Sequence, residues 1–159
     1  MLQKILIATG DSLESVEVFK SGLTLAEKYG AQISILHVLN LFQNGFEVIG
    51  TPLMGGTYPM MNDLAIQEYQ KELQDRAKQG MERLESYATE ARAINITAEI
   101  FQNMGDAGRT ICETAKNYSA DVIVMGRNQR SVLSEIFLGS TSNYVLHHAH
   151  CSVFVIQQK

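Results

Sequence analysis

Cysteine, long apolar runs and basic side chains are all scarce in this chain, and each scarcity excludes a class of protein. Only Cys112 and Cys151 are present, so we expect no disulfide framework and a cytoplasmic location. The first apolar run ends at the turn residue Gly10, which predicts a strand and neither a signal peptide nor a membrane span. Thirteen basic against seventeen acidic residues give a net charge of -4, which argues against nucleic acid as a partner.

The remaining composition is that of a folded protein. Hydrophobic residues make up 45% and charged residues 19% of the chain, which is typical of a globular domain and not of a disordered segment. A length of 159 residues suits one domain with a substantial core. We therefore expect a single domain over residues 1–159.

Short β-branched runs alternate with amphipathic stretches. The runs predict strands over residues 4–9, 32–39, 96–102, 122–125 and 152–156. The stretches predict helices over residues 11–30, about 62–93, 105 to about 118, and around 144–146. This alternation predicts an α/β fold with a doubly wound, Rossmann-like parallel sheet and helices on both faces. Ligands of such sheets bind beyond the carboxyl ends of the strands.

The first helix carries a start signal and a stop signal. Asp11 with Glu14 three residues later resembles a capping box, and Gly30 is a typical C-terminal residue. The predicted buried stripe has spacings of three and four residues: Leu13, Val16, Phe19, Leu23 and Ala26. The predicted buried face of the long helix is Leu73, Ala77, Met81, Leu84, Ala88 and Ala91.

The periodic pattern stops in a long loop at about residues 40–61. Both prolines, Pro52 and Pro59, lie there together with several glycines and many apolar residues. Loops of this length in a compact domain are usually lids, binding segments or disordered stretches. We expect the loop to fold over the domain or against a partner.

The stretch from Asp121 to Ser142, DVIVMGRNQRSVLSEIFLGSTS, predicts a phosphate-binding turn. Gly126 ends a buried strand, and Gly139 directly precedes Ser140, Thr141 and Ser142 at the start of a helix. Glycine lets a backbone approach a ligand closely, and a helix N-terminus attracts anions. The stretch is not a Walker motif, because it contains no lysine. Ordinary turn chemistry and helix capping are the alternative interpretation of both glycines.

Four potential metal ligands crowd together at His147, His148, His150 and Cys151. Structural zinc sites usually draw their ligands from two separated pairs, so a single cluster does not predict a metal site. Histidines near a helix C-terminus are favourable for the helix dipole alone. His37, within an apolar strand, is expected to be a core or pocket-lining residue with a satisfied hydrogen bond.

Several segments together resemble the universal stress protein family. They are KILIATGDSLES, ILHVL, GDAGRTICETAKNYSADVIVMG, SNYVLHHAHCSVFVI and the pattern G-x-x-Q-x9-G-S-T from Gly126 to Thr141. The resemblance implies a five-stranded sheet of order 3-2-1-4-5 and a homodimer, often formed through the last strand, here Ser152–Ile156. One subgroup of the family binds ATP or related adenine nucleotides through G-x2-G-x9-G-(S/T).

The resemblance also implies a set of binding residues. Ala8 and Thr9 match the end of strand one beside the base and ribose, and Val38 matches a position whose backbone meets adenine. The full candidate set is Ala8, Thr9, Gly10, Asp11, Val38, Met125, Gly126, Arg127, Gln129, Arg130, Gly139, Ser140, Thr141 and Ser142.

Two positions depart from the family pattern, and two others add charge. Gln129 replaces the middle glycine of the motif, and Gly10 stands where the family has an acidic residue, with Asp11 displaced by one. Arg127 and Arg130 would add guanidinium groups beside the phosphates.

The resulting expectation is a stress-response regulatory protein that binds ATP, ADP or AMP, with Mg²⁺ as a candidate companion ion and no dedicated catalytic residues. One alternative is a slow ATP hydrolase on the same fold, because a site that orients phosphates gives some rate without a base. Another is a nucleotide-free dimeric module that contacts an unknown regulatory partner through the long loop. Neither a membrane nor a nucleic acid is an expected partner.

Overall fold

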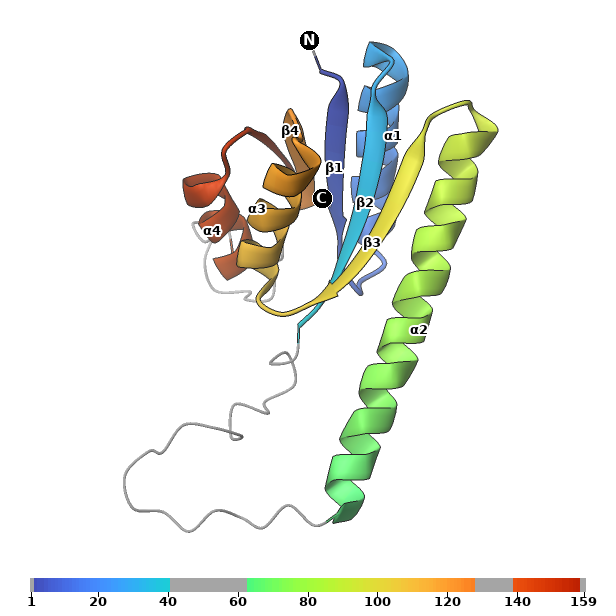
Figure 1. Ribbon diagram of the computed structural model, residues 1–159, viewed down its shortest axis with the longest axis vertical. Coiled ribbons are helices and arrows are strands. Elements are labelled where there is room, and N and C mark those ends of the chain that lie inside the picture. Colours follow the sequence, from blue (N-terminus) through green and yellow to red (C-terminus); the bar gives the residue numbers. More distant parts are fainter. Residues whose placement is uncertain (1, 41–62, 128–138, 158–159) are drawn as a thin grey trace.

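The computed structural model describes residues 2–40, 63–127 and 139–157, with side chains from residue 67 onward in the second range. Five strands form one sheet, and every pair of neighbours is parallel, in the order β3-β2-β1-β4-β5 (Figure 1). This topology confirms the predicted doubly wound α/β fold. The elements in chain order are β1 Lys4–Thr9, α1 Ser15–Tyr29, β2 Gln32–Leu39, α2 Asp63–Ala93, β3 Ala98–Met104, α3 Ala107–Tyr118, β4 Val122–Gly126, α4 Ser140–His148 and β5 Ser152–Ile156.

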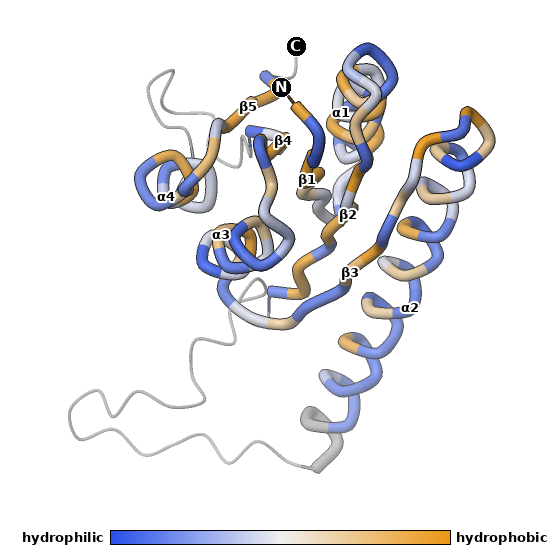
Figure 2. The backbone as a smooth tube through the Cα atoms, turned by 45° about the horizontal axis from the view of Figure 1, so that its top comes forward, coloured by the Kyte–Doolittle hydropathy of each residue, from blue (hydrophilic) through white to orange (hydrophobic). Residues whose placement is uncertain are grey.

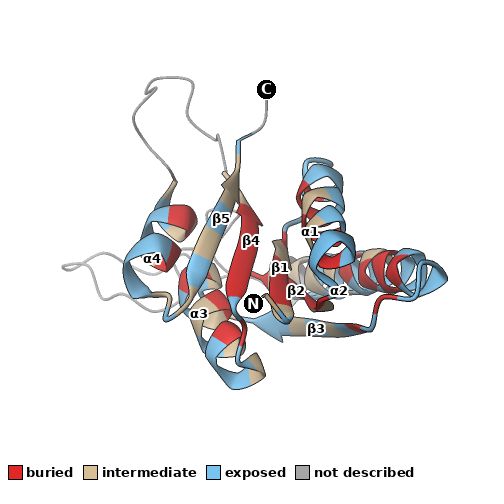
Figure 3. Ribbon diagram, turned by 90° about the horizontal axis from the view of Figure 1, so that it is seen from above, coloured by how far each residue is buried: buried red, intermediate tan, exposed pale blue. Residues whose placement is uncertain are grey.

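The sheet separates two hydrophobic clusters. Side chains alternate along a strand, so Ile5 and Ile7 of β1 face one cluster with α1 and α2, while Leu6 faces the other with α3 and α4. Figures 2 and 3 show these helix pairs on opposite faces of the sheet. Each fully buried aliphatic side chain of this kind contributes about 1.5–3 kcal/mol of burial free energy. The two clusters fix the central strands and therefore the edge at which they end.

The start of α1 differs from the prediction. The helix begins at Ser15, its N-cap is Glu14, and no side chain caps it, so the predicted capping box of Asp11 and Glu14 is wrong. Leu13 is 92% exposed and Val16 41%, so neither belongs to the core. The inward stripe consists of Ser15, Val18, Phe19, Gly22, Leu23 and Ala26. Gly30, with φ of 64°, ends the helix as predicted.

The long helix α2 runs over 63–93, close to the predicted span. Leu84, Ala88 and Ala91 are buried as predicted, but Met81 is 38% exposed. Leu73 and Ala77 are only half-buried, because the N-terminal half of α2 extends past the sheet (Figure 1). Strand β3 lies at the sheet edge, as the expected order 3-2-1-4-5 implies, and is partly exposed, although it spans Ala98–Met104 and not 96–102.

Among the described residues, no helix has the length and apolar character needed to cross a membrane. The long loop predicted at residues 40–61 lies, apart from Asn40, outside the described residues.

Candidate functional site

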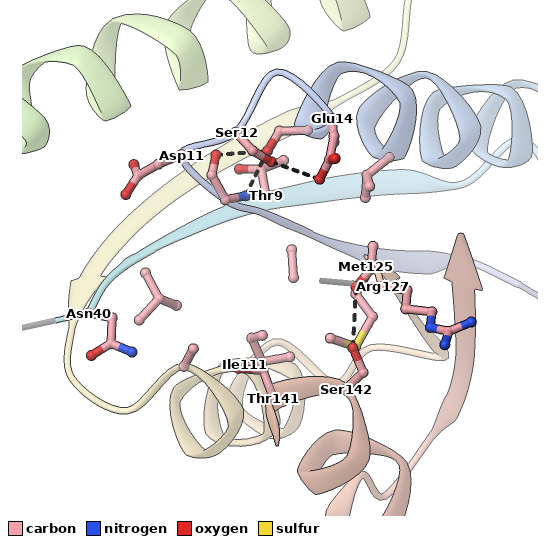
Figure 4. Close-up of a pocket in the computed structure, with 17 residues that line it drawn as sticks. Thr9, Asp11, Ser12, Glu14, Asn40, Ile111, Met125, Arg127, Thr141 and Ser142 are labelled. Atoms are coloured by element: carbon pink, nitrogen blue, oxygen red, sulfur yellow. Dashed lines mark hydrogen bonds between the residues drawn. The ribbon is translucent and has the colours of Figure 1, made fainter. Parts of the chain in front are cut away.

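A cavity of about 180 Å³ opens at the carboxyl ends of β1, β2 and β4. The N-terminal ends of α1, α3 and α4 complete its walls (Figure 4). This is the edge at which doubly wound sheets bind their ligands. The residues that line it are Ala8, Thr9, Gly10, Asp11, Ser12, Glu14, Ser15, Val18, Val38, Asn40, Ala107, Ile111, Met125, Gly126, Arg127, Thr141 and Ser142.

One wall, the β1 wall, consists of the end of β1 and the turn formed by residues 10–14. The Ser15 hydroxyl accepts a hydrogen bond from the Gly10 amide at 2.9 Å and donates one to the Gly10 carbonyl at 2.7 Å. The Thr9 hydroxyl donates to the Leu36 carbonyl of β2 at 3.1 Å. These bonds close the turn against α1 and fix its backbone beside the cavity.

The opposite wall, the β4 wall, joins the end of β4 to the start of α4. Gly139 precedes the helix with φ of 75°, a conformation that glycine adopts easily. The buried Ser142 hydroxyl donates to the Gly126 carbonyl at 3.3 Å and ties the first turn of α4 to β4. The first amides of a helix have no intrahelical acceptor, so this wall favours a negatively charged ligand.

Most of the predicted site residues meet at this cavity. Those that line it are Ala8, Thr9, Gly10, Asp11, Val38, Met125, Gly126, Arg127, Thr141 and Ser142. Gly139 is the N-cap of α4 and Ser140 is its first residue, and neither lines the cavity. Gln129 and Arg130 lie outside the described residues. Nucleotide contact by any of these residues stays a prediction.

The Arg127 guanidinium lies on the β5 side of the cavity (Figure 4). Its backbone amide donates to the Ile156 carbonyl of β5 at 3.0 Å. The guanidinium group was expected beside the phosphates at the start of α4. It lies elsewhere because the chain leaves β4 alongside the edge strand β5.

Asp11 lines the cavity, yet its carboxylate points outward (Figure 4). Oδ1 lies 2.7 Å from His37 Nε2 and 3.0 Å from Arg83 Nη2, and Oδ2 lies 2.7 Å from Arg76 Nη2. The hydrogen bond from His37, together with the one from Arg76, holds the pKa of the Asp11 carboxyl well below its usual range despite partial burial. Asp11 therefore stays ionised and its oxygens are turned toward α2.

His37 is buried, with 1% of its surface exposed, and its hydrogen bond is satisfied, as predicted for a core residue. The sequence pattern did not reveal its partners, which are Asp11 in the turn after β1 and Gln102 of β3.

Sequence reasoning missed seven lining residues, namely Ser12, Glu14, Ser15, Val18, Asn40, Ala107 and Ile111. A usable signal existed for two of them. Asn40 directly follows β2 and Ala107 follows the turn after β3, and parallel strands end at one edge of a sheet.

In the described ranges, no three His, Cys, Asp or Glu side chains group as a metal site. The His148 ring stacks on Tyr144, with ring centroids 4.0 Å apart. Burial raises the pKa of the Cys112 and Cys151 thiols. Both cysteines are therefore held as neutral thiols and are poor nucleophiles.

Comparison with known proteins identifies relatives along the whole chain. The model of the universal stress protein family matches residues 1–157. Universal stress protein Slr1101 of Synechocystis sp. is 41% identical over 104 residues, which cover 65% of this chain and 96% of that protein. Universal stress protein Sll1388 of the same organism is 31% identical over 97% of both chains.

Solved structures share the fold at low identity. A universal stress protein family protein from Arabidopsis thaliana with AMP bound gives a TM-score of 0.64 at 17% identity, over 99% of this chain and 92% of that one. The universal stress protein from Archaeoglobus fulgidus in complex with dAMP gives 0.57 at 18% identity, over 98% of both chains.

Proposed function

The chain belongs to the universal stress protein family, and from this premise we propose that it binds adenine nucleotides in the cavity at the ends of β1, β2 and β4, as a cytoplasmic stress-response regulator. The observation that carries the proposal is the first turn of α4, where Thr141 and Ser142 line the cavity opposite the end of β1. Phosphate groups are favoured at such a helix N-terminus because unpaired amides and the helix dipole act together.

The rest of the cavity suits a nucleoside. Val38, Val18 and Ile111 offer apolar surface for a base, while Thr9, Ser12 and Asn40 offer polar groups for a ribose. The Asp11 carboxylate is engaged by His37, Arg76 and Arg83, so its charge is compensated and repels a phosphate less. The AMP and dAMP complexes of the two structural neighbours support the same ligand class.

Isothermal titration with AMP, ADP and ATP, each with and without Mg²⁺, tests the proposal. We expect saturable binding of at least one nucleotide with one site per chain, and weaker binding of adenosine, which lacks the phosphate. Absence of saturation with all three nucleotides at millimolar concentration would refute it.

We further propose a homodimer that pairs β5 with β5 of a second copy. Within the described residues β5 pairs only with β4, and Phe154 on it is 46% exposed. An open apolar edge strand promotes aggregation unless a partner covers it. Light scattering after size exclusion should report a dimer that Phe154→Lys converts to a monomer. A dimer that survives Phe154→Lys and Val155→Lys would place the interface elsewhere.

A further inference from the structure

A polar cluster lies just outside the cavity, between the β1 wall and α2. We propose that Arg76 and Arg83 of α2 are positioning residues for the cavity, because they hold the turn of residues 10–14 through the Asp11 carboxylate. The inference rests on the proposed nucleotide binding and adds to it a supporting role for α2.

The geometry makes Asp11 a bridge between two elements distant in sequence. Its two oxygens accept hydrogen bonds from Arg76 at 2.7 Å and from Arg83 at 3.0 Å. These arginines lie about two helical turns apart on one face of α2. One carboxylate thus fixes the turn against a long segment of helix, and neither arginine lines the cavity.

A second set of contacts aligns α2 with the sheet beneath it. Gln102 Nε2 donates to the Ala77 carbonyl at 2.8 Å and lies 3.2 Å from His37 Nδ1. Because the amide nitrogen must face the carbonyl, His37 Nδ1 is the acceptor, and Nε2 carries the proton donated to Asp11 at 2.7 Å. The chain of bonds therefore runs from α2 through β3 and β2 to the turn.

Gly80 lets the helix come this close. A Cβ added there would lie 2.4 Å from His37 Nδ1 and 2.7 Å from Gln102 Nε2. Glycine inside a helix costs about 1 kcal/mol relative to alanine, so its presence has a packing reason here. The helix is held near enough for both guanidinium groups to reach Asp11.

Linkage then makes the effect reciprocal. If α2 stabilises the binding-competent turn, a ligand that needs this turn stabilises the contacts of α2 by the same factor. Affinity at the cavity and protection of α2 should therefore change together.

The test combines AMP titration with hydrogen exchange. Arg76→Gln with Arg83→Gln should weaken AMP binding about threefold to tenfold, Asp11→Asn should do likewise, and combining all three should add little further. Lys78→Gln, which removes one charge from an exposed position of α2, is the matched control and should leave the affinity unchanged. In the wild type, AMP should slow amide exchange in residues 73–84.

Unchanged AMP affinity in both the double arginine variant and the isosteric Asp11→Asn would overturn the inference, as would equal losses with Lys78→Gln. If the wild-type chain binds no nucleotide, the proposed function fails separately, and amide exchange in residues 10–14 decides this inference. Faster exchange there in the double arginine variant supports the positioning role, and unchanged exchange refutes it.

Discussion

The two walls of the cavity are built in different ways. The β4 wall uses small residues and backbone groups that are near in sequence, such as Gly126 and Ser142. The β1 wall depends on three side chains from two other elements, because Asp11 bonds to His37 of β2 and to Arg76 and Arg83 of α2. The first wall is a local motif whose helix N-terminus favours an anion, whereas the second is a tertiary arrangement that includes contacts to α2. Substitutions in the β4 wall should change nucleotide affinity. Substitutions in the β1 wall should change both nucleotide affinity and the stability of the protein.

Among the substitutions around the cavity, the largest stability effect is expected at the contact that supports the β1 wall. Gly80→Ala should destabilise the protein by about 2–3 kcal/mol in urea unfolding, because the new methyl group overlaps His37 and Gln102. Helix propensity alone predicts a gain of about 1 kcal/mol. Gln79→Ala, at the neighbouring exposed position, is the control and should stay within about 0.5 kcal/mol of the wild type. A stabilised Gly80→Ala variant would show that α2 does not approach the sheet this closely.

The β4 wall should respond in the opposite way. Thr141→Asp places a carboxylate in the first turn of α4, where it favours the helix by about 0.3–1 kcal/mol, yet it should weaken AMP binding at least about tenfold by repelling phosphate. Titration and thermal unfolding of one sample report both quantities. Ser140→Asp, one residue earlier and outside the cavity lining, should weaken binding much less. Equal losses of AMP affinity for the two variants would contradict a specific role of Thr141 in binding.

The charge of Asp11 should make the β1 wall sensitive to acid. The folded-state pKa of Asp11 is lowered from an unfolded value of about 3.9. The contribution of the Asp11 charge to the free energy of unfolding is therefore complete above about pH 4. It is lost as the pH falls from there toward the folded-state pKa.

Asp11→Asn should accordingly cost about 1 kcal/mol at pH 7, a modest figure because both Asp11 and Arg83 are about one-third exposed. The difference from the wild type should shrink at pH 3. Asp75→Asn, at an exposed position of α2, should show no such trend. A constant difference across pH would mean that the Asp11 contacts do not depend on its charge.

The smallest effect is expected at the start of α1, where Leu13 is 92% exposed. Leu13→Ala should change the free energy of unfolding by less than about 0.5 kcal/mol. Leu23→Ala is the matched substitution at a buried position of the same helix and should cost about 2–5 kcal/mol. A similar loss of stability for the two substitutions would show that Leu13 is part of the hydrophobic core.

These differences explain what could be predicted from the sequence. The strands were found because buried β-branched runs such as Val122, Ile123 and Val124 have a local signature. The β4 wall was found because its glycines and hydroxyl residues follow one another along the chain. Hydrophobic spacing alone placed Leu13 and Val16 inward, since a pattern of three and four residues does not reveal where a helix begins.

The β1 wall could not be predicted by the same means. Asp11 and Glu14 have the spacing of a capping box, but the competing partners of Asp11 lie 26 to 72 residues away. The two arginine contacts exist only after α2 has packed on the sheet, and Gly80 offered no local sign of its role. Long-range ionic contacts overrode a local preference.

A crystal structure of the chain grown with AMP tests nucleotide binding at this cavity most directly. We expect the adenine beside Val38 and the phosphate at the amides of Thr141 and Ser142. Density for AMP at another surface, or an empty cavity at saturating AMP, would contradict the proposed function.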